Sequence, residues 1–227
     1  MQQGLSVYTC SDGTKTIYNK FLDETYHSRN GAIPESLHVF IKEGFLYSLN
    51  QQPKNEITIF EMGFGSGLNA ILTYIESQKF THLKINYITV ETNPISFELV
   101  SELQFINYDS NYYKIYKQMH DSEFNKLIEI SENFKLLKLN KSLIDLDFNK
   151  LPLFDIVYFD AFAPDKQPEL WTLENMQKIF SQCHSGAVFT TYSSKGEVKR
   201  NLIKAGFNVE RLKGPPKKRH MLRATKI

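Results

Sequence analysis

ITIFEMGFGSGLN, residues 57–69, joins a short apolar run to the start of a helix through three glycines. The helix is predicted because Leu68, Ile71, Leu72 and Ile75 follow the i, i+3, i+4, i+7 spacing of one apolar face. Glycine adopts backbone angles that other residues resist and lets a ligand approach the main chain. The helix N-terminus presents free N–H groups to polar ligand groups. The stretch therefore predicts a small-molecule cradle, although a turn that only packs a helix on a sheet could have the same sequence.

The glycine spacing separates this cradle from a dinucleotide site. Gly63, Gly65 and Gly67 form G-x-G-x-G, whereas dinucleotide sites prefer G-x-G-x-x-G, so a dinucleotide oxidoreductase is disfavoured. Glu91 ends a second β-rich run, 85–90, and lies 24 residues beyond Gly67. An acid at that strand end can accept hydrogen bonds from both hydroxyls of a ribose. A solvated acid would also be ordinary there, but with the glycines Glu91 predicts a ribose-containing cofactor without a pyrophosphate.

Alternating apolar patterns predict an α/β fold with a doubly wound, mostly parallel sheet. Further strands are predicted at 136–139, 154–160 and 187–192, and further helices at 97–106, 124–128, 170–183 and 198–205. The runs 207–212 and 220–224 predict an antiparallel C-terminal hairpin at one edge, and 8–18 predicts a small N-terminal hairpin. We expect residues 1–50 to form this hairpin and a segment that covers the ligand. Residues 51–227 would form the main domain, the whole being one compact unit.

Acidic side chains stand at the carboxyl ends of the predicted strands, where open α/β sheets bind their ligands. Glu61, Glu91 and Asp160 occupy such ends, together with Gly63. The apolar segment 161–164 follows Asp160 and would give its carboxyl a partly dry wall. Asp160 is therefore a candidate for meeting a reacting group, although an aspartate at a strand end also commonly caps the next turn.

Basic residues are concentrated in the C-terminal part of the chain. The formal net charge is +2, but residues 195–227 hold eleven Lys or Arg against two acids, a net charge of +9, and the remainder carries −7. Such asymmetry indicates contact with a polyanion, although a charge run is often only a solvated face. The loop 213–219, KGPPKKR, lies between the predicted hairpin strands. A rigid basic loop loses little entropy when it binds phosphates, so we predict a phosphate-binding surface here.

Cysteine usage and the N-terminal sequence restrict the class of protein. Cys10 and Cys183 are the two cysteines, without a C-x-x-C pair or a histidine cluster, so neither a disulfide framework nor a metal site is predicted. Both are expected to be packing residues. The N-terminal residues lack the basic-then-apolar pattern of a signal peptide, and no stretch approaches the ~20 apolar residues of a membrane span. We therefore expect a cytoplasmic protein.

Three segments together resemble one protein family. They are EMGFGSGLN (61–69), DAFAPDKQPELW (160–171) and KGPPKKRHML (213–222), and the loop 26–35 is similar as well. The family is the methyltransferase domain of the bifunctional tRNA-modifying protein MnmC, which also occurs as the stand-alone enzyme MnmD. The similarity spans nearly the whole chain in the same order, and the block 160–171 is specific to this family.

The resemblance implies a class I S-adenosylmethionine-dependent methyltransferase with a Rossmann-like fold. Its expected reaction is N-methylation of 5-aminomethyl-2-thiouridine at the wobble position of tRNA, which gives 5-methylaminomethyl-2-thiouridine. S-adenosyl-L-methionine is the expected cofactor, and tRNA is the expected partner. The oxidase domain of the bifunctional form has no room in 227 residues, so only methyl transfer is expected of this chain. A separate oxidase could supply the aminomethyl precursor.

The resemblance also implies roles for individual residues. Those expected at the cofactor are Tyr26, Ser28, Glu35, Glu61, Gly63, Gly65, Gly67, Glu91 and Asp160. The basic C-terminal part then fits as the tRNA-binding surface, and the residues expected at tRNA are Phe162, Lys195, Lys199, Arg200, Lys217, Lys218 and Arg219. The glycines would line the methionine part of the cofactor, Glu91 would hold its ribose, and Asp160 would meet the acceptor amine. Phe162, or alternatively Trp171, would stack on the splayed wobble base, while the cations would contact phosphates.

One segment departs from the family pattern. Similar proteins tend to carry an acid near the adenine just after the third strand, whereas this chain has Asn140-Lys141-Ser142 there. Asp145 is a weak substitute for that acid.

Two other functions fit part of the sequence. A class I transferase acting on a small-molecule amine would use similar glycines and acids but has no need for the basic C-terminal part. A non-catalytic RNA-binding relative would keep the basic hairpin, but the intact glycines, Glu91 and Asp160 argue against it. In the preferred reaction Asp160 accepts a hydrogen bond from the amine and helps to remove its proton. A nearby carboxylate also stabilises the ammonium form, which opposes deprotonation, so Asp160 is expected above all to orient the amine.

Overall fold

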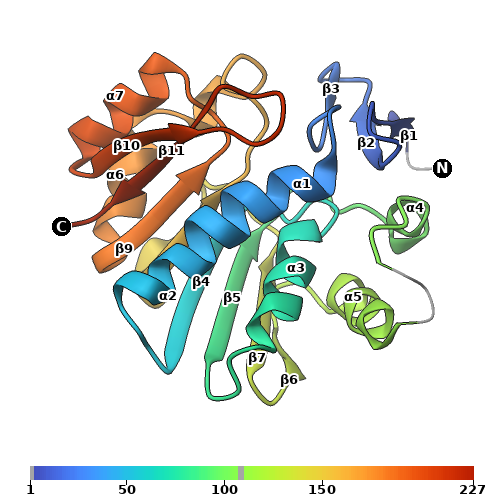
Figure 1. Ribbon diagram of the computed structural model, residues 1–227, viewed down its shortest axis with the longest axis horizontal. Helices are drawn as coiled ribbons and strands as arrows, with labels where there is room; N and C mark the ends of the chain where they lie inside the picture. The colour runs from blue at the N-terminus through green and yellow to red at the C-terminus, as the bar shows by residue number, and fades with distance from the viewer. Residues whose placement is uncertain (1–2, 107–109) are drawn as a thin grey trace.

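A large twisted sheet organises the chain in the computed structural model, which describes residues 3–106 and 110–227 (Figure 1). Within these residues the sheet has eight strands in the order β10-β11-β9-β8-β4-β5-β7-β6. The strands are β4 (Glu56–Met62), β5 (Lys84–Val90), β6 (Leu127–Ser131), β7 (Phe134–Leu139), β8 (Phe154–Phe159), β9 (Cys183–Thr191), β10 (Asn208–Lys213) and β11 (His220–Thr225). The five strands from β9 to β7 pair in parallel, whereas β10, β11 and β6 run antiparallel at the edges. The predicted mostly parallel sheet with its C-terminal hairpin is confirmed.

Helices cover both faces of this sheet, because the central strands are apolar on both sides. In β4, Ile57 and Ile59 belong to one buried cluster, while Phe60 and Met62 belong to the other. The first cluster packs beneath α3 (Leu68–Ser77), α4 (Phe97–Ser101) and α5 (Asn111–Asp121). The second packs beneath α6 (Leu173–Ser181) and α7 (Gly196–Ala205). Short 3-10 turns lie at η2 (Phe148–Lys150) and η3 (Pro168–Leu170).

The N-terminal part lies against the carboxyl edge of the sheet. It forms a small antiparallel sheet of β1 (Leu5–Thr9), β2 (Lys15–Asn19) and β3 (Glu24–Thr25), so the predicted hairpin is confirmed. A long helical segment follows, with α1 (Ala32–Ser36), the π-helical stretch η1 (Leu37–Leu46) and α2 (Tyr47–Gln51), and crosses the face of the main sheet (Figure 1). Gly44 permits this close crossing, since a Cβ there would lie 3.0 Å from the Tyr158 ring.

Several predicted elements differ from the structure. The helix predicted at 124–128 is wrong: Leu127–Ser131 is the edge strand β6, and the helix α5 precedes it at Asn111–Asp121. Three apolar residues at such spacing fit a strand as well as a helix. The helix predicted at 97–106 ends at Ser101, before Gln104 turns the chain with φ 55°. The helix predicted at 170–183 is shorter as well, because Cys183 already begins β9.

The buried Arg223 fastens the C-terminal hairpin to the long helical segment. Its guanidinium donates to Glu43 on η1 (Nη1 to Oε2, 2.7 Å) and to Glu210 on β10 (Nη2 to Oε2, 3.0 Å). The same group lies 3.4 Å above the centre of the Tyr47 ring. These contacts join β10 and β11 to the long helical segment, so a residue in the basic C-terminal part stabilises the fold.

Among the described helices, none has the length and apolar character that crossing a membrane requires.

We predict that Arg223→Met lowers the free energy of unfolding by roughly 2–4 kcal/mol, because it removes the buried guanidinium that pairs with Glu43 and Glu210 and leaves Glu43 paired, among the described residues, with the exposed Lys42 alone. Urea unfolding followed by circular dichroism measures this difference, with the exposed Lys204→Met as the control. Equal stability of the two variants would contradict the proposed fastening.

Candidate functional site

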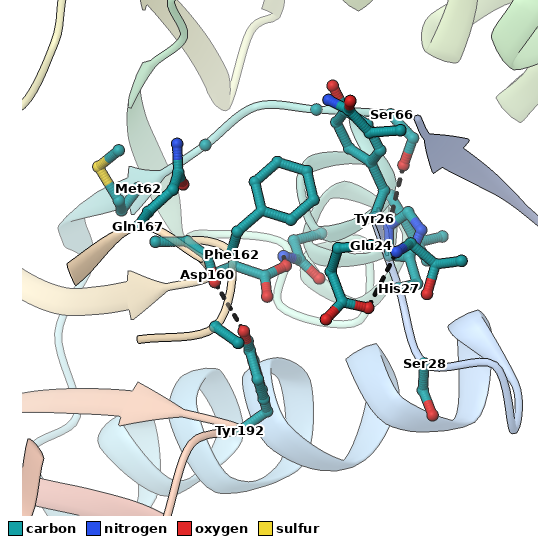
Figure 2. Close-up of a pocket in the computed structure, with 18 of the residues that line it drawn as sticks. Glu24, Tyr26, His27, Ser28, Met62, Ser66, Asp160, Phe162, Gln167 and Tyr192 are labelled. Atoms are coloured by element: carbon teal, nitrogen blue, oxygen red, sulfur yellow. Dashed lines mark hydrogen bonds between the residues drawn. The ribbon is translucent and has the colours of Figure 1, made fainter. Parts of the chain in front are cut away.

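A cavity of about 420 Å³ opens at the carboxyl ends of β4, β5, β8 and β9. That size lies within the range of about 300–1,000 Å³ typical of small-molecule sites. The cavity lies between the glycine-rich loop (63–67) on one side and N-terminal residues from 19–35 on the other. We refer to residues 19–35 as the covering segment. Of the residues singled out in the sequence, those lining it are Tyr26, Ser28, Glu35, Gly63, Gly65, Glu91, Asp160, Phe162 and Lys218. Figure 2 shows part of this lining, with Asp160 and Phe162 facing Tyr26 and His27.

The glycine-rich loop is shaped by left-handed backbone angles at Gly63 (φ 88°), Gly65 (φ 50°) and Gly67 (φ 71°). A Cβ at Gly65 would lie 3.2 Å from the Tyr26 ring, so a side chain there would crowd the covering segment. Gly67 does not line the cavity. It is the N-cap of α3 instead, and a Cβ there would lie 2.9 Å from His120 Nε2. The first two glycines thus keep the cavity wall bare, whereas the third makes the turn into the helix.

Glu91 lies one residue beyond β5 and is tied to the glycine-rich loop. Its Oε2 accepts from the Gly65 N–H at 2.9 Å, and its Oε1 accepts from the Asn93 N–H at 2.8 Å. These bonds fix the carboxylate at the cavity wall. A carboxylate offers about four lone-pair sites, so both oxygens can still accept from ligand hydroxyls.

Asp160 follows β8 directly and contacts Asn69, a buried polar residue in the first turn of α3. Its Oδ2 accepts from Asn69 Nδ2 at 2.8 Å. Burial raises the pKa of Asp160 to about 7, and the nearby Glu35 carboxylate adds to the rise, while Asn69 and Lys218 oppose it. A carboxyl group with this pKa exchanges a proton near neutral pH, as a general base must. Sequence reasoning missed Asn69, although a polar residue beside the apolar Leu68 and Ile71 was a usable signal.

Glu61 lies beneath the cavity and does not line it. Strand alternation turns its side chain away from the neighbouring Met62, toward the α3 side of the sheet. Burial, followed by the charge of Asp160, raises the pKa of Glu61 well above its ordinary value. This environment disfavours the charged form of the Glu61 side chain under the glycine-rich loop. Within the described part of the chain, its Oε2 has no hydrogen-bond partner.

The covering segment is hydrogen-bonded to the glycine-rich loop through His27. One ring nitrogen, Nε2, lies 3.1 Å from Ser66 Oγ (Figure 2). The other, Nδ1, lies 3.1 Å from Thr16 Oγ1. Burial lowers the pKa of His27 to about 4, so the ring is neutral at physiological pH. Tyr26 packs edge-on against Phe162 with ring centroids 4.9 Å apart. Sequence reasoning did not single out His27, although it adjoins Tyr26 and Ser28.

Lys218 departs from the other predicted phosphate contacts, because it lines the cavity. Its Nζ donates to Glu35 Oε1 at 2.5 Å and lies 4.4 Å above the Tyr192 ring. Tyr192 follows β9 and donates its hydroxyl to the Ala161 carbonyl at 2.8 Å. The strand-end rule that singled out Asp160 also applies to Tyr192, which sequence reasoning missed.

The remaining predicted cations lie outside the cavity. Lys195, Lys217, Arg200 and Arg219 are exposed, and Lys199 is half-buried. Lys195 forms an ion pair with the exposed Asp165. Lys217 donates to Ser11 Oγ at 2.9 Å, so the basic loop touches the N-terminal hairpin.

Two alternatives from the sequence do not reach the cavity. Trp171 is 3% exposed and donates from Nε1 to the Phe162 carbonyl at 2.9 Å, which makes it a core residue. Asp145 is exposed and does not line the cavity. Cys10 and Cys183 are buried free thiols, as predicted. In the described residues there is no group of three or more His, Cys, Asp or Glu side chains placed to hold a metal ion.

Comparison with known proteins identifies relatives of this chain. The family model described as S-adenosyl-L-methionine-dependent methyltransferase matches residues 104–227. The tRNA 5-methylaminomethyl-2-thiouridine biosynthesis bifunctional protein MnmC of Pseudoalteromonas atlantica is 30% identical over 230 residues, which cover 93% of this chain and 32% of that protein. The protein of the same name from Campylobacter fetus is 30% identical over 220 residues, covering 92% of this chain and 34% of that protein. The chain thus spans about a third of the length of these relatives.

A solved structure extends the similarity to the fold. The crystal structure of MNMC2 from Aquifex aeolicus superposes with a TM-score of 0.81 at 25% sequence identity, and the match covers 99% of this chain and 71% of that one. A glycine-rich loop, a strand-end acid and a cavity at the carboxyl edge agree with the cofactor that the matching family model describes. The chain belongs to the family of S-adenosyl-L-methionine-dependent methyltransferases.

Proposed function

We propose that this chain methylates the amine of 5-aminomethyl-2-thiouridine at the tRNA wobble position, giving 5-methylaminomethyl-2-thiouridine. The observation that carries the proposal is Asp160, a carboxyl group with a pKa of about 7 in the cavity wall next to the glycine-rich loop. An amine acceptor needs such a group to receive its proton. The relatives in Pseudoalteromonas atlantica and Campylobacter fetus are named for biosynthesis of this nucleoside, which supports the choice of substrate.

The residues present fit S-adenosyl-L-methionine. Gly63 and Gly65 leave the wall bare beside the cavity, and Glu91 offers two oriented oxygens for ribose hydroxyls. Tyr26, Ser28 and Glu35 would cover the cofactor from the N-terminal side, and we propose this covering role for residues 1–50 as a whole. Glu61 would support the glycine-rich loop from below, and Gly67 would set its turn.

When bound, the cofactor would supply an activated methyl group on a sulfonium sulfur, which a neutral amine can attack in line while the sulfur leaves as a thioether. The chain's own task is to hold the amine close to that methyl group and to take its proton. Asp160 does both through one carboxylate: Asn69 fixes Oδ2, and the carboxylate accepts a hydrogen bond from the amine. Because its pKa lies near 7, Asp160 can take a proton from an ammonium group at neutral pH and release it to solvent afterwards.

The basic surface outside the cavity would hold the tRNA. Lys195, Lys199, Arg200, Lys217 and Arg219 would contact phosphates, which position an RNA without reading its sequence. Phe162 would stack on the splayed wobble base, since its ring lines the cavity.

We further propose a cytoplasmic location, where tRNA is found. A separate oxidase would supply the aminomethyl precursor of the proposed reaction.

We predict that the purified chain transfers labelled methyl from S-adenosyl-L-methionine to tRNA lacking the final wobble methyl. Nucleoside mass spectrometry should then find the label on 5-methylaminomethyl-2-thiouridine. Asp160→Asn should keep cofactor affinity within about threefold and lose at least 100-fold in turnover, the size of a typical general-base contribution. Unlabelled tRNA with a bound cofactor would refute the substrate and point to a small-molecule amine. Unchanged turnover in Asp160→Asn would remove Asp160 from the mechanism.

We predict that Gly65→Ala weakens S-adenosyl-L-methionine binding at least tenfold, because its Cβ would press on the Tyr26 ring at 3.2 Å. Gly13→Ala is a matched control: Gly13 also has a left-handed backbone (φ 85°), but a Cβ there would meet nothing within 4 Å. Both variants should lose about 1 kcal/mol of stability through backbone strain. Isothermal titration calorimetry separates the two effects, and equal affinity in both variants would contradict the cradle.

We predict that replacing Lys217 and Arg219 together by Ala weakens tRNA binding and flattens its dependence on salt. Each lost phosphate contact should reduce the slope of log K against log salt by about 0.7–0.9. Fluorescence anisotropy between 50 and 200 mM salt, about the range over which such contacts act, measures the slope. Replacing the exposed Lys114 and Lys150 by Ala controls for net charge. A slope changed equally by both pairs would refute a localised surface.

A further inference from the structure

Lys218 has different surroundings from the other basic residues of its loop. Lys217 and Arg219 are exposed, whereas Lys218 is half-buried and lines the cavity together with Glu35, Asp160 and Tyr192. A cation inside a small-molecule cavity acts on the groups that share it more strongly than a solvated cation would, because water screens it less.

Glu35 is fully engaged by its neighbours. Its Oε1 accepts from Lys218 Nζ at 2.5 Å, and its Oε2 accepts from the Ser28 N–H at 2.9 Å. Glu35 is 8% exposed, so this carboxylate is held in the wall with a partner on each oxygen. The Tyr192 ring beneath Lys218 Nζ holds the cation from the other side.

Asp160 is engaged on one oxygen only in the described part of the chain. Asn69 donates to its Oδ2 at 2.8 Å, and no described residue donates to its Oδ1. The titratable groups that act on Asp160 come from every element around it: Glu35 from α1, Lys218 from the basic loop, Glu61 and Tyr87 from the strands below, and Tyr192 after β9. Glu24, Glu91 and Arg29 line the cavity as well. The charges that shift the pKa of Asp160 are those of Glu35 and Lys218, and Lys218 is bound to Glu35.

We propose that Lys218 is a positioning residue for methyl transfer, which neutralises Glu35 and so leaves Asp160 as the carboxylate that takes the acceptor's proton. This proposal rests on the proposed function and deepens it, because it moves Lys218 from the tRNA surface to the reaction. The proton passes from the ammonium nitrogen to Asp160, the nitrogen lone pair forms the new N–C bond, and the C–S electron pair remains on the sulfur. Lys218 and Glu35 exchange no proton in this step.

Glu35 and Lys218 have opposite effects on the pKa of Asp160. A like charge disfavours the carboxylate and an opposite charge favours it. The Glu35 charge therefore raises the pKa of Asp160, and the Lys218 charge lowers it. Removing Lys218 should raise the pKa of Asp160, whereas removing the Glu35 charge should lower it. A purely structural role for the ion pair would give no such pair of opposite shifts.

The first test needs neither cofactor nor tRNA. Carbon-13 NMR of protein labelled at the aspartate carboxyls follows the titration of Asp160, which is assigned by its absence in Asp160→Asn. Lys218→Met should raise the midpoint by about one pH unit and Glu35→Gln should lower it by about one unit, the size that a neighbouring charge produces. Lys217→Met, one residue away and outside the cavity, should leave it in place. Shifts in the same direction in both cavity variants, or none in either, would overturn the proposal.

The second test uses methyl transfer to tRNA as a function of pH. Lys218→Met should lower kcat at pH 7 severalfold, recover at higher pH and keep KM for tRNA, while Lys218→Arg restores the wild-type profile. Lys217→Met should raise KM for tRNA without moving the pH midpoint. If Lys218→Met instead raises KM alone, Lys218 is a phosphate contact and the proposal fails. If the wild type methylates no tRNA, the proposed substrate fails, while the NMR titration still decides the electrostatic claim.

Discussion

The parallel register of three neighbouring strands fixes the site. Met62 at the end of β4 pairs with Val90 of β5 and with Phe159 of β8, so all three strands end at the same level. The next residue of each strand is Gly63, Glu91 and Asp160, respectively. The glycine-rich loop, Glu91 and Asp160 are therefore neighbours because the strand register places them side by side. A shift of register in any one strand would separate them.

Much of this arrangement could be predicted from the sequence, because buried parallel strands and amphipathic helices leave strong patterns. The glycine-rich turn, the central strands and both hairpins were predictable for that reason. The segment 124–128 was not, since its few apolar residues fit two periodicities and only pairing with β7 makes it a strand. The ends of α4 and α6 depend on turns and strand pairing that come from distant residues.

The site could be predicted only in part, and the failures share a physical cause. Strand-end residues such as Glu91 and Asp160 follow from topology, which the sequence pattern reveals. Lys218 and its neighbour Lys217 are identical in type and adjacent in sequence, yet one lines the cavity and the other faces solvent. That difference arises from the packing of the basic loop against α1 and Tyr192, which no local pattern encodes. Glu61 likewise has the strand-end position but points beneath the loop.

The ion pair between Glu35 and Lys218 also bears on how the molecule folds. Its partners are 183 residues apart in the chain, while most of the strand pairs that build the cavity floor join closer segments. Contacts between distant residues form slowly, because the loop entropy must be lost before the contact repays it. The sheet and its glycine-rich loop can therefore assemble before the cavity closes. Until the basic loop docks, Glu35 and Asp160 remain two unneutralised carboxyl groups facing the same space, and cofactor binding would favour completion of the fold.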